Sequence, residues 1–83
     1  MNATVKNGEV IIKFSDEEAL VLLEWLHNMN EQEHKSLFQD QAEERILFDL
    51  EAALEEVILV TFEGNYIDTL SKARTRVRDN LDL

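Results

Sequence analysis

The chain has 83 residues, of which 45% are hydrophobic and 31% charged, and it contains neither cysteine nor proline. This length fits one domain and excludes a second, and the apolar fraction is too high for a disordered acidic tail. The 18 acidic and 8 basic side chains give a formal charge of −10, which argues against nucleic acid or an anionic membrane surface as a direct partner.

Residues 1–14 are predicted to form a β-hairpin. Asn7-Gly8 supplies the two positive-φ positions of a tight turn, and the stretch from Val10 to Phe14 is rich in strand formers. A two-stranded hairpin by itself is marginally stable in water. We therefore expect this one to lay a face on helices or to pair with another strand.

Residues 15–30 are predicted to form the first helix. Ser15 is its expected N-cap, because Glu18 follows at capping-box spacing and acidic residues fill the first turn. At 100° per residue, Leu20 and Val21 point away from the main apolar face. That face consists of Ala19, Leu22, Leu23, Leu26 and Met29. Together these residues form an apolar band that is too wide for a single neighbouring element to cover.

Residues 37–59 are predicted to form a long second helix after a polar connection, with Ser36 as its N-cap. Its main face consists of Ala42, Ile46, Leu50, Ala53 and Val57, with Leu47 and Leu54 alongside, and the opposite side carries Phe48, Ala52 and Leu59. Two apolar faces are typical of a central helix. The β-branched run at 57–62 also fits a strand, and we favour helix to Leu59 followed by an extended exit.

Residues 66–80 are predicted to form the third helix, after Gly64 and Asn65 break the chain. Its buried residues are expected to be Ile67, Leu70, Ala73, Val77 and Leu81. The predicted fold class is therefore α+β and mainly α: a single domain with an N-terminal β-hairpin followed by a three-helix bundle whose second helix is long.

Charge is segregated along this layout. Residues 15–56 carry 13 acidic side chains against only Lys35 and Arg45, whereas residues 71–78 carry four cations and no acid. We expect Arg74 and Arg78 to be paired with carboxylates of the first two helices. The glutamates expected to point outward and stay free for a partner are Glu17, Glu24, Glu44, Glu51 and Glu55.

Two Glu-x-x-His spacings lie one heptad apart, Glu24 with His27 and Glu31 with His34. Residues three apart share a side of a helix, so each pair could offer a carboxylate and an imidazole to one metal ion. This predicts, as an alternative function, a carboxylate and histidine metal-binding protein that is active only as a dimer. Otherwise these four side chains are solvated surface, and no metal or other cofactor is expected.

An enzyme is not expected, because the chain has no cysteine and its serines fit caps or helix surface. The basic third helix lacks aromatic residues between its cations, so direct nucleic-acid binding is not expected either. We predict a small acidic module that binds a basic protein, such as an inhibitor, an immunity-type protein or a regulatory partner. Its binding residues would be the five outward glutamates and Phe48.

A homodimer is also expected, because a chain this short without disulfides gains from extending its core through a second copy. The expected contact surfaces are the wide apolar band of the first helix and the side of the second helix that carries Phe48 and Leu59. No apolar run is long enough for a membrane span and no leader pattern opens the chain, so the expected compartment is the cytoplasm.

Two segments carry a resemblance, residues 38–58 with Asp-Leu-Glu followed by spaced leucines, and residues 66–79 with Tyr-x-x-x-Leu-x-x-Ala-Arg. In these segments the chain resembles short uncharacterised bacterial proteins of unassigned function. The resemblance covers about half the chain and implies a bacterial cytoplasmic origin. It implies no activity and no catalytic residue.

Overall fold

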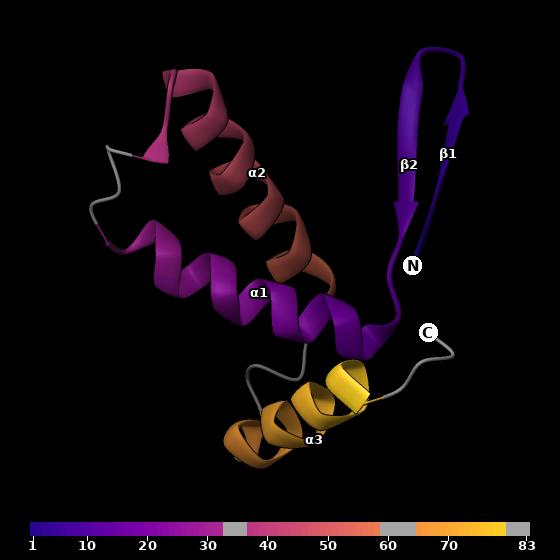
Figure 1. Cartoon of the computed structure of the whole chain (residues 1–83), viewed down its shortest axis with the longest axis vertical. Helices are drawn as coiled ribbons and strands as arrows, with labels where there is room; N and C mark the ends of the chain where they lie inside the picture. Colours follow the sequence, from indigo (N-terminus) through magenta and orange to yellow (C-terminus); the bar gives the residue numbers. More distant parts are fainter. Residues whose placement is uncertain (33–36, 59–64, 80–83) are drawn as a thin grey trace.

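The computed structural model describes residues 1–32, 37–58 and 65–79, and it consists of an antiparallel hairpin followed by three helices (Figure 1). The strands are β1 (Asn2–Lys6) and β2 (Glu9–Lys13). The helices are α1 (Asp16–Asn30), α2 (Gln41–Val57) and α3 (Tyr66–Asp79). The predicted fold class is confirmed. No helix among the described residues has the length and apolar character needed to span a membrane.

The turn between the strands has the predicted geometry. Asn7 has φ 53° and Gly8 has φ 81°, the two positive values that a two-residue turn of the primed type requires. The turn fixes the register, so Lys6 lies opposite Glu9 and Val5 lies opposite Val10. Asn and Gly accept these angles at low cost, which is why the local sequence alone predicts this element.

The start of α1 is also set by local hydrogen bonds. The hydroxyl of Ser15 accepts from the backbone N–H of Glu18 at 3.1 Å, and the carboxylate of Glu18 accepts from the backbone N–H of Ser15 at 2.8 Å. This reciprocal capping box satisfies two backbone donors that a helix start otherwise leaves unpaired. The predicted N-cap is confirmed.

The predicted bounds of α2 are wrong at both ends. The helix begins at Gln41, because the Asp40 carboxylate accepts from the backbone N–H of Ala42 at 2.8 Å and Asp40 itself is extended. It ends at Val57, and Ile58 has an extended backbone with φ −96° and ψ 98°. Ser36 and residues 59–62 lie outside the described residues. At 17 residues, α2 is still longer than α1 with 15 and α3 with 14.

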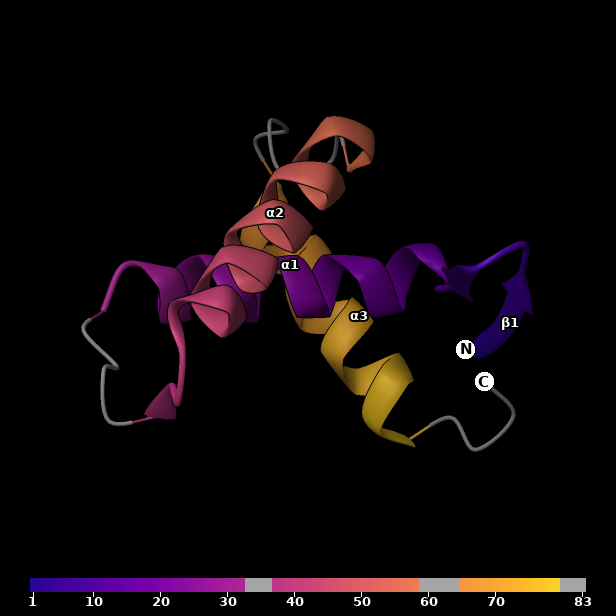
Figure 2. The ribbon, with the colours of Figure 1, turned by 90° about the horizontal axis from the view of Figure 1, so that it is seen from above.

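The middle helix is α1, not the second helix as predicted. Figure 1 shows α2 and α3 on opposite sides of α1, and Figure 2 shows both of them crossing it. Within the described residues α1 packs against both neighbours, whereas α2 and α3 do not pack against each other. The buried core consists of Ala19, Leu20, Leu23, Leu26, Leu54, Ile58, Leu70 and Ala73.

This arrangement corrects the predicted faces of all three helices. Leu20 is buried at 3% exposure, since α1 is covered from two sides and its apolar band wraps further round than one neighbour would require. On α2 the packed residues are Leu47, Leu50 and Leu54, while Ile46 and Val57 are 65% and 70% exposed. On α3 the expected core residue Ile67 is 82% exposed. Leu59 and Leu81 lie outside the described residues.

Candidate interaction surface

His27 joins α1 to α2 through a cluster of carboxylates. Its Nδ1 lies 3.1 Å from Glu51 Oε2 on α2, and its Nε2 lies 3.2 Å from Glu31 Oε1, one turn further along the chain. Asn30 donates to Glu51 Oε1 at 2.7 Å and to the backbone carbonyl of Leu47 at 3.4 Å. The end of α1 is therefore attached to the middle of α2 by polar side chains beside the apolar contacts.

These contacts favour the charged forms of both partners. The hydrogen bond to Glu51 raises the pKa of His27 above its ordinary value of 6.5, and the charges of Glu31, Glu51 and Glu24 act in the same direction against partial desolvation. Partial burial raises the pKa of Glu51, but the hydrogen bonds from Asn30 and His27 outweigh it and the net pKa is lowered. The pair is thus an imidazolium and a carboxylate over a wider pH range than free side chains.

Glu24 is held by α3. The Tyr66 hydroxyl donates to Glu24 Oε2 at 2.5 Å, and both residues are half-buried. Burial, together with this hydrogen bond and the Glu24 charge, raises the pKa of Tyr66 to about 12. Glu24 was expected to stay free for a partner, but it links α1 to the first turn of α3 instead.

Glu17 is held by α3 as well. Its Oε2 is buried and lies 2.8 Å from Arg76 Nε. This atom has no hydrogen-bond partner among the described residues, and the ion pair with Arg76 compensates its charge there. Arg76 follows the buried Ala73 by three residues, which brings it to the α1 side of α3.

The predicted internal pairs of Arg74 and Arg78 are wrong: Arg78 binds the adjacent Asp79 at 3.0 Å, and no carboxylate of α1 or α2 in the described ranges pairs with Arg74.

The remaining residues of the predicted binding surface lie together on one face of α2. Glu44, Phe48 and Glu55 follow one another at intervals of four and seven residues, so they share a side of the helix. All three are exposed, and Phe48 keeps 44% of its surface exposed. An aromatic ring flanked by carboxylates is thus open to solvent on the side of α2 that also carries Glu51.

The predicted metal ligands are only partly brought together. His27 and Glu31 are in contact, Glu24 is bound to Tyr66, and His34 lies outside the described residues. The structure instead gathers ligand atoms of His27, Glu51 and Glu55 within 4.8 Å of one another. The spacing of Glu51 and Glu55 could indicate two ligands on one helix face, but only the packing of α2 on α1 brings them to His27.

The hairpin has an open apolar face. Strand alternation and the register place Ala3, Val5, Val10 and Ile12 on one face, and the polar residues with Ile11 on the other. Every residue of both strands is exposed, including Val5 at 75% and Val10 at 66%. Neither strand packs against any of the three helices, and Figure 1 shows the hairpin projecting away from them. Of the two expected ways of supporting the hairpin, packing on the helices is therefore not found among the described residues, and pairing with another strand stays a prediction.

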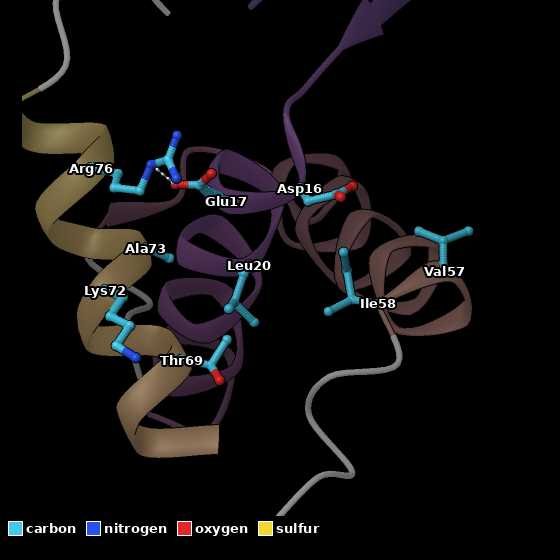
Figure 3. Close-up of a pocket in the computed structure, with 9 residues that line it drawn as sticks. All are labelled: Asp16, Glu17, Leu20, Val57, Ile58, Thr69, Lys72, Ala73 and Arg76. Carbon is cyan, nitrogen blue, oxygen red and sulfur yellow. Dashed lines mark ion pairs between the residues drawn. The ribbon is translucent and has the colours of Figure 1, made fainter. Parts of the chain in front are cut away.

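A cavity of about 490 Å³ lies between the start of α1, the end of α2 and α3 (Figure 3). Its apolar part is formed by Leu20, Val57, Ile58 and Ala73, and charged side chains surround that part. Those charges are largely compensated internally, because Arg76 pairs with Glu17 and Lys72 with Asp68 at 3.5 Å. No local pattern in the sequence predicts this cavity, because it depends on how three helices meet.

Comparisons of the chain with protein-family models, curated proteins and solved structures found no match. The resemblance to short bacterial proteins therefore stays a prediction.

Proposed function

We propose that this chain is a non-enzymatic interaction module that binds a basic protein, as an inhibitor, an immunity-type protein or a regulatory partner does. The observation that carries the proposal is the exposed α2 face of Glu44, Phe48 and Glu55. Aromatic side chains are enriched at the centres of protein interfaces, and the flanking carboxylates suit a partner that has cations around an apolar pocket.

The overall charge supports the same proposal. At −10, the chain attracts a basic partner at long range and accelerates its encounter. Glu17, Glu24 and Glu51 contribute to this field, but each already has an internal partner, and breaking these contacts would oppose direct binding through them. We assign direct contact to Glu44 and Glu55, which are both exposed; Glu55 also has a ligand atom within 4.8 Å of those of His27 and Glu51. We place the module in the cytoplasm, as the sequence analysis expects.

The test is capture of the partner from the source cell with three baits. One bait is the native chain, the second carries Glu44→Gln, Phe48→Asp and Glu55→Gln, and the matched control carries Glu43→Gln, Ile46→Asp and Glu56→Gln on another face of α2. The proposal predicts a basic protein that binds the native and control baits, is lost from the second bait, and forms a stoichiometric complex after purification. A protein retained equally by all three baits would contradict it.

A second candidate function is metal binding, which the convergence of His27, Glu51 and Glu55 favours. These three side chains, with Glu31 beside His27, offer the nitrogen and oxygen ligands that transition metals accept. The predicted alternative had Glu24, His27, Glu31 and His34 as its ligands and required a dimer to be active; of these, Glu24 is bound to Tyr66 and His34 lies outside the described residues. The test is elemental analysis of protein purified without added metal: a stoichiometric ion that is lost on His27→Ala favours this function, and its absence leaves the interaction module.

A further inference from the structure

The hairpin lacks support within the described part of the chain. Its two strands have five residues each, all of them exposed, and neither packs against a helix. Beside the strands, the Met1 ammonium lies 3.5 Å from Glu18 of α1 and Phe14 packs against the core, so the hairpin is held only at its base. Figure 2 shows it beyond the start of α1, away from the region where the helices cross. A two-stranded hairpin needs a third strand or a helix against its apolar face for stability. Some further pairing is therefore required to explain why these residues form strands.

The outer edge of β2 is the first place to look for that pairing. Backbone groups in an antiparallel pair point alternately toward the neighbouring strand and away from it, and the pair that flanks a two-residue turn is hydrogen-bonded. Lys6 and Glu9 are that pair, so Glu9, Ile11 and Lys13 direct their backbone groups to β1. Val10 and Ile12 direct theirs to the open edge, where a further strand would bond to them.

The sequence of β2, Glu-Val-Ile-Ile-Lys, is complementary to itself when two copies run antiparallel. With Ile11 opposite Ile11 of a second copy, Glu9 lies opposite Lys13 at both ends, and Val10 lies opposite Ile12. This register also places the outward backbone groups of Val10 and Ile12 opposite each other, as hydrogen bonding demands. A register shifted by two residues in either direction keeps the hydrogen-bonding pattern, but it no longer places Glu9 of either copy opposite Lys13 of the other.

We propose that two copies of this chain join edge to edge through β2, giving a four-stranded antiparallel sheet with a two-fold axis at Ile11. The sheet has one continuous apolar face, made by Ala3, Val5, Val10 and Ile12 of both copies. On the other face Glu9 lies between Lys6 of its own copy and Lys13 of the second copy. The pairing also accounts for Ile11, the single apolar residue on the polar face, which meets its own counterpart at the axis.

The open edge of β2 is occupied by a second copy of the chain, and this pairing does not depend on the proposed basic partner. Charge complementarity favours the edge of β2 over that of β1. If two copies of β1 paired in the same way, Asn2 would lie opposite Lys6 and no opposite charges would meet. It also replaces the dimer contact through Phe48 that the sequence analysis expected. A failed partner capture would not contradict the dimer, and a monomeric chain would not contradict the proposed basic partner.

The test uses charge reversal on the full chain, with mass measured by sedimentation equilibrium from micromolar to millimolar concentration. Native protein is expected to shift from 9.7 kDa to twice that mass. In the dimer, Lys13→Glu places a glutamate opposite Glu9 of the other copy at both ends of the pairing. Within its own hairpin, residue 13 lies opposite Asn2, which is neutral, so the substitution creates no like-charge pair there. It is expected to raise the dimer dissociation constant by at least about tenfold. Lys72→Glu, with the same charge change on α3, is the matched control and is expected to have little effect.

The decisive step mixes two variants. Glu9→Lys is combined with Lys6→Glu, so that this pair within the hairpin keeps opposite charges. This variant alone is also expected to weaken the dimer, but an equimolar mixture with Lys13→Glu restores both opposite-charge pairs across the axis and is expected to form a heterodimer. A second readout is hydrogen exchange of the Val10 and Ile12 amides, which should become protected as the dimer forms.

Four outcomes would overturn the proposal. They are a monomer at all concentrations, a dimer that Lys13→Glu leaves unchanged, equal weakening by Lys72→Glu, and a mixture of the two strand variants that does not associate. In the second case, loss of the dimer on Phe48→Asp would identify the α2 face as the interface.

Discussion

Replacing His27 with glutamine tests whether the polar link between α1 and α2 contributes to stability. In the native chain both ring nitrogens of His27 lie close to carboxylates, Glu51 at 3.1 Å and Glu31 at 3.2 Å. Glutamine retains hydrogen-bonding capacity but carries no charge at any pH. The difference between native and His27→Gln protein therefore reports mainly the charged part of these two contacts.

The magnitude follows from exposure. The His27 side chain is 49% exposed, so solvent screens both contacts, and a pair of this kind contributes about 0.2–1 kcal/mol. The Glu51 side chain is only 14% exposed, so the energy of its contact with His27 should lie near the top of that range. The Glu31 side chain is 66% exposed and better screened, so the energy of its contact should lie near the bottom. Together they are expected to contribute about 1 kcal/mol, which corresponds to roughly 4–8 °C in Tm for a domain of this size.

The direction of the pH dependence is fixed by the two pKa shifts. The folded pKa of His27 lies above 6.5, so its contribution is fully present below pH 6.5 and is lost as pH rises through the folded pKa. The folded pKa of Glu51 lies below 4.5, so its contribution is present above pH 4.5 and is lost as pH falls through the folded pKa. The link should therefore be strongest between pH 4.5 and 6.5.

Thermal unfolding followed by circular dichroism, at about pH 5.5 and about pH 8.5, measures this difference. His27→Gln should lower Tm at the acidic pH and lower it much less at the alkaline pH. Glu51→Gln and the double variant complete a thermodynamic cycle that isolates the pair from the other contacts of each residue. A Tm difference that is the same at both pH values, or a coupling energy of zero at about pH 5.5, would refute the reasoning.

Three further predictions concern the core, the turn and the link to α3. Leu26→Ala, at a side chain with no exposed surface, should lower the free energy of unfolding in urea by about 2–5 kcal/mol, and a loss below 1 kcal/mol would place Leu26 outside the core. Gly8→Ala should destabilise the turn at φ 81° by about 1 kcal/mol and disturb hairpin amides in NMR spectra without changing the helical circular dichroism, because the hairpin does not pack on the helices. Tyr66 should titrate in ultraviolet absorbance with a pKa of about 12, and Glu24→Ala, which removes both the acceptor oxygen and its charge, should bring the pKa closer to 10; an unchanged pKa would show that the contact with Glu24 does not contribute to the shift.

The elements that sequence predicted well are those fixed by hydrogen bonds between near neighbours. Asn7-Gly8 and the Ser15–Glu18 capping box each specify backbone angles or bonds within four residues, so the same rules hold in any tertiary context. The start of α2 obeys such a rule as well. Asp40 caps it, and an aspartate directly before the helix is a local capping signal, although the sequence analysis predicts Ser36 as the cap.

The faces of the helices are less well determined, because a helical wheel shows where apolar residues lie but not which of them find a neighbour. The apolar band of α2 extends from Ile46 and Val57 to Leu47 and Leu54, which is wider than one partner helix covers. Only the crossing of α2 over α1 decides that Leu54 is buried and that Ile46 stays in water.

The candidate site depends on tertiary structure for the same reason. Sequence alone identified the dense acidity of the first two helices, and Glu44, Phe48 and Glu55 are exposed as it predicted. It could not show that Glu17, Glu24 and Glu51 are held by Arg76, Tyr66 and Asn30, because these partners lie 21 to 59 residues away along the chain. Local spacing sets which side chains share a face, whereas only the packing of the three helices decides which carboxylates find a donor and which remain open to a partner.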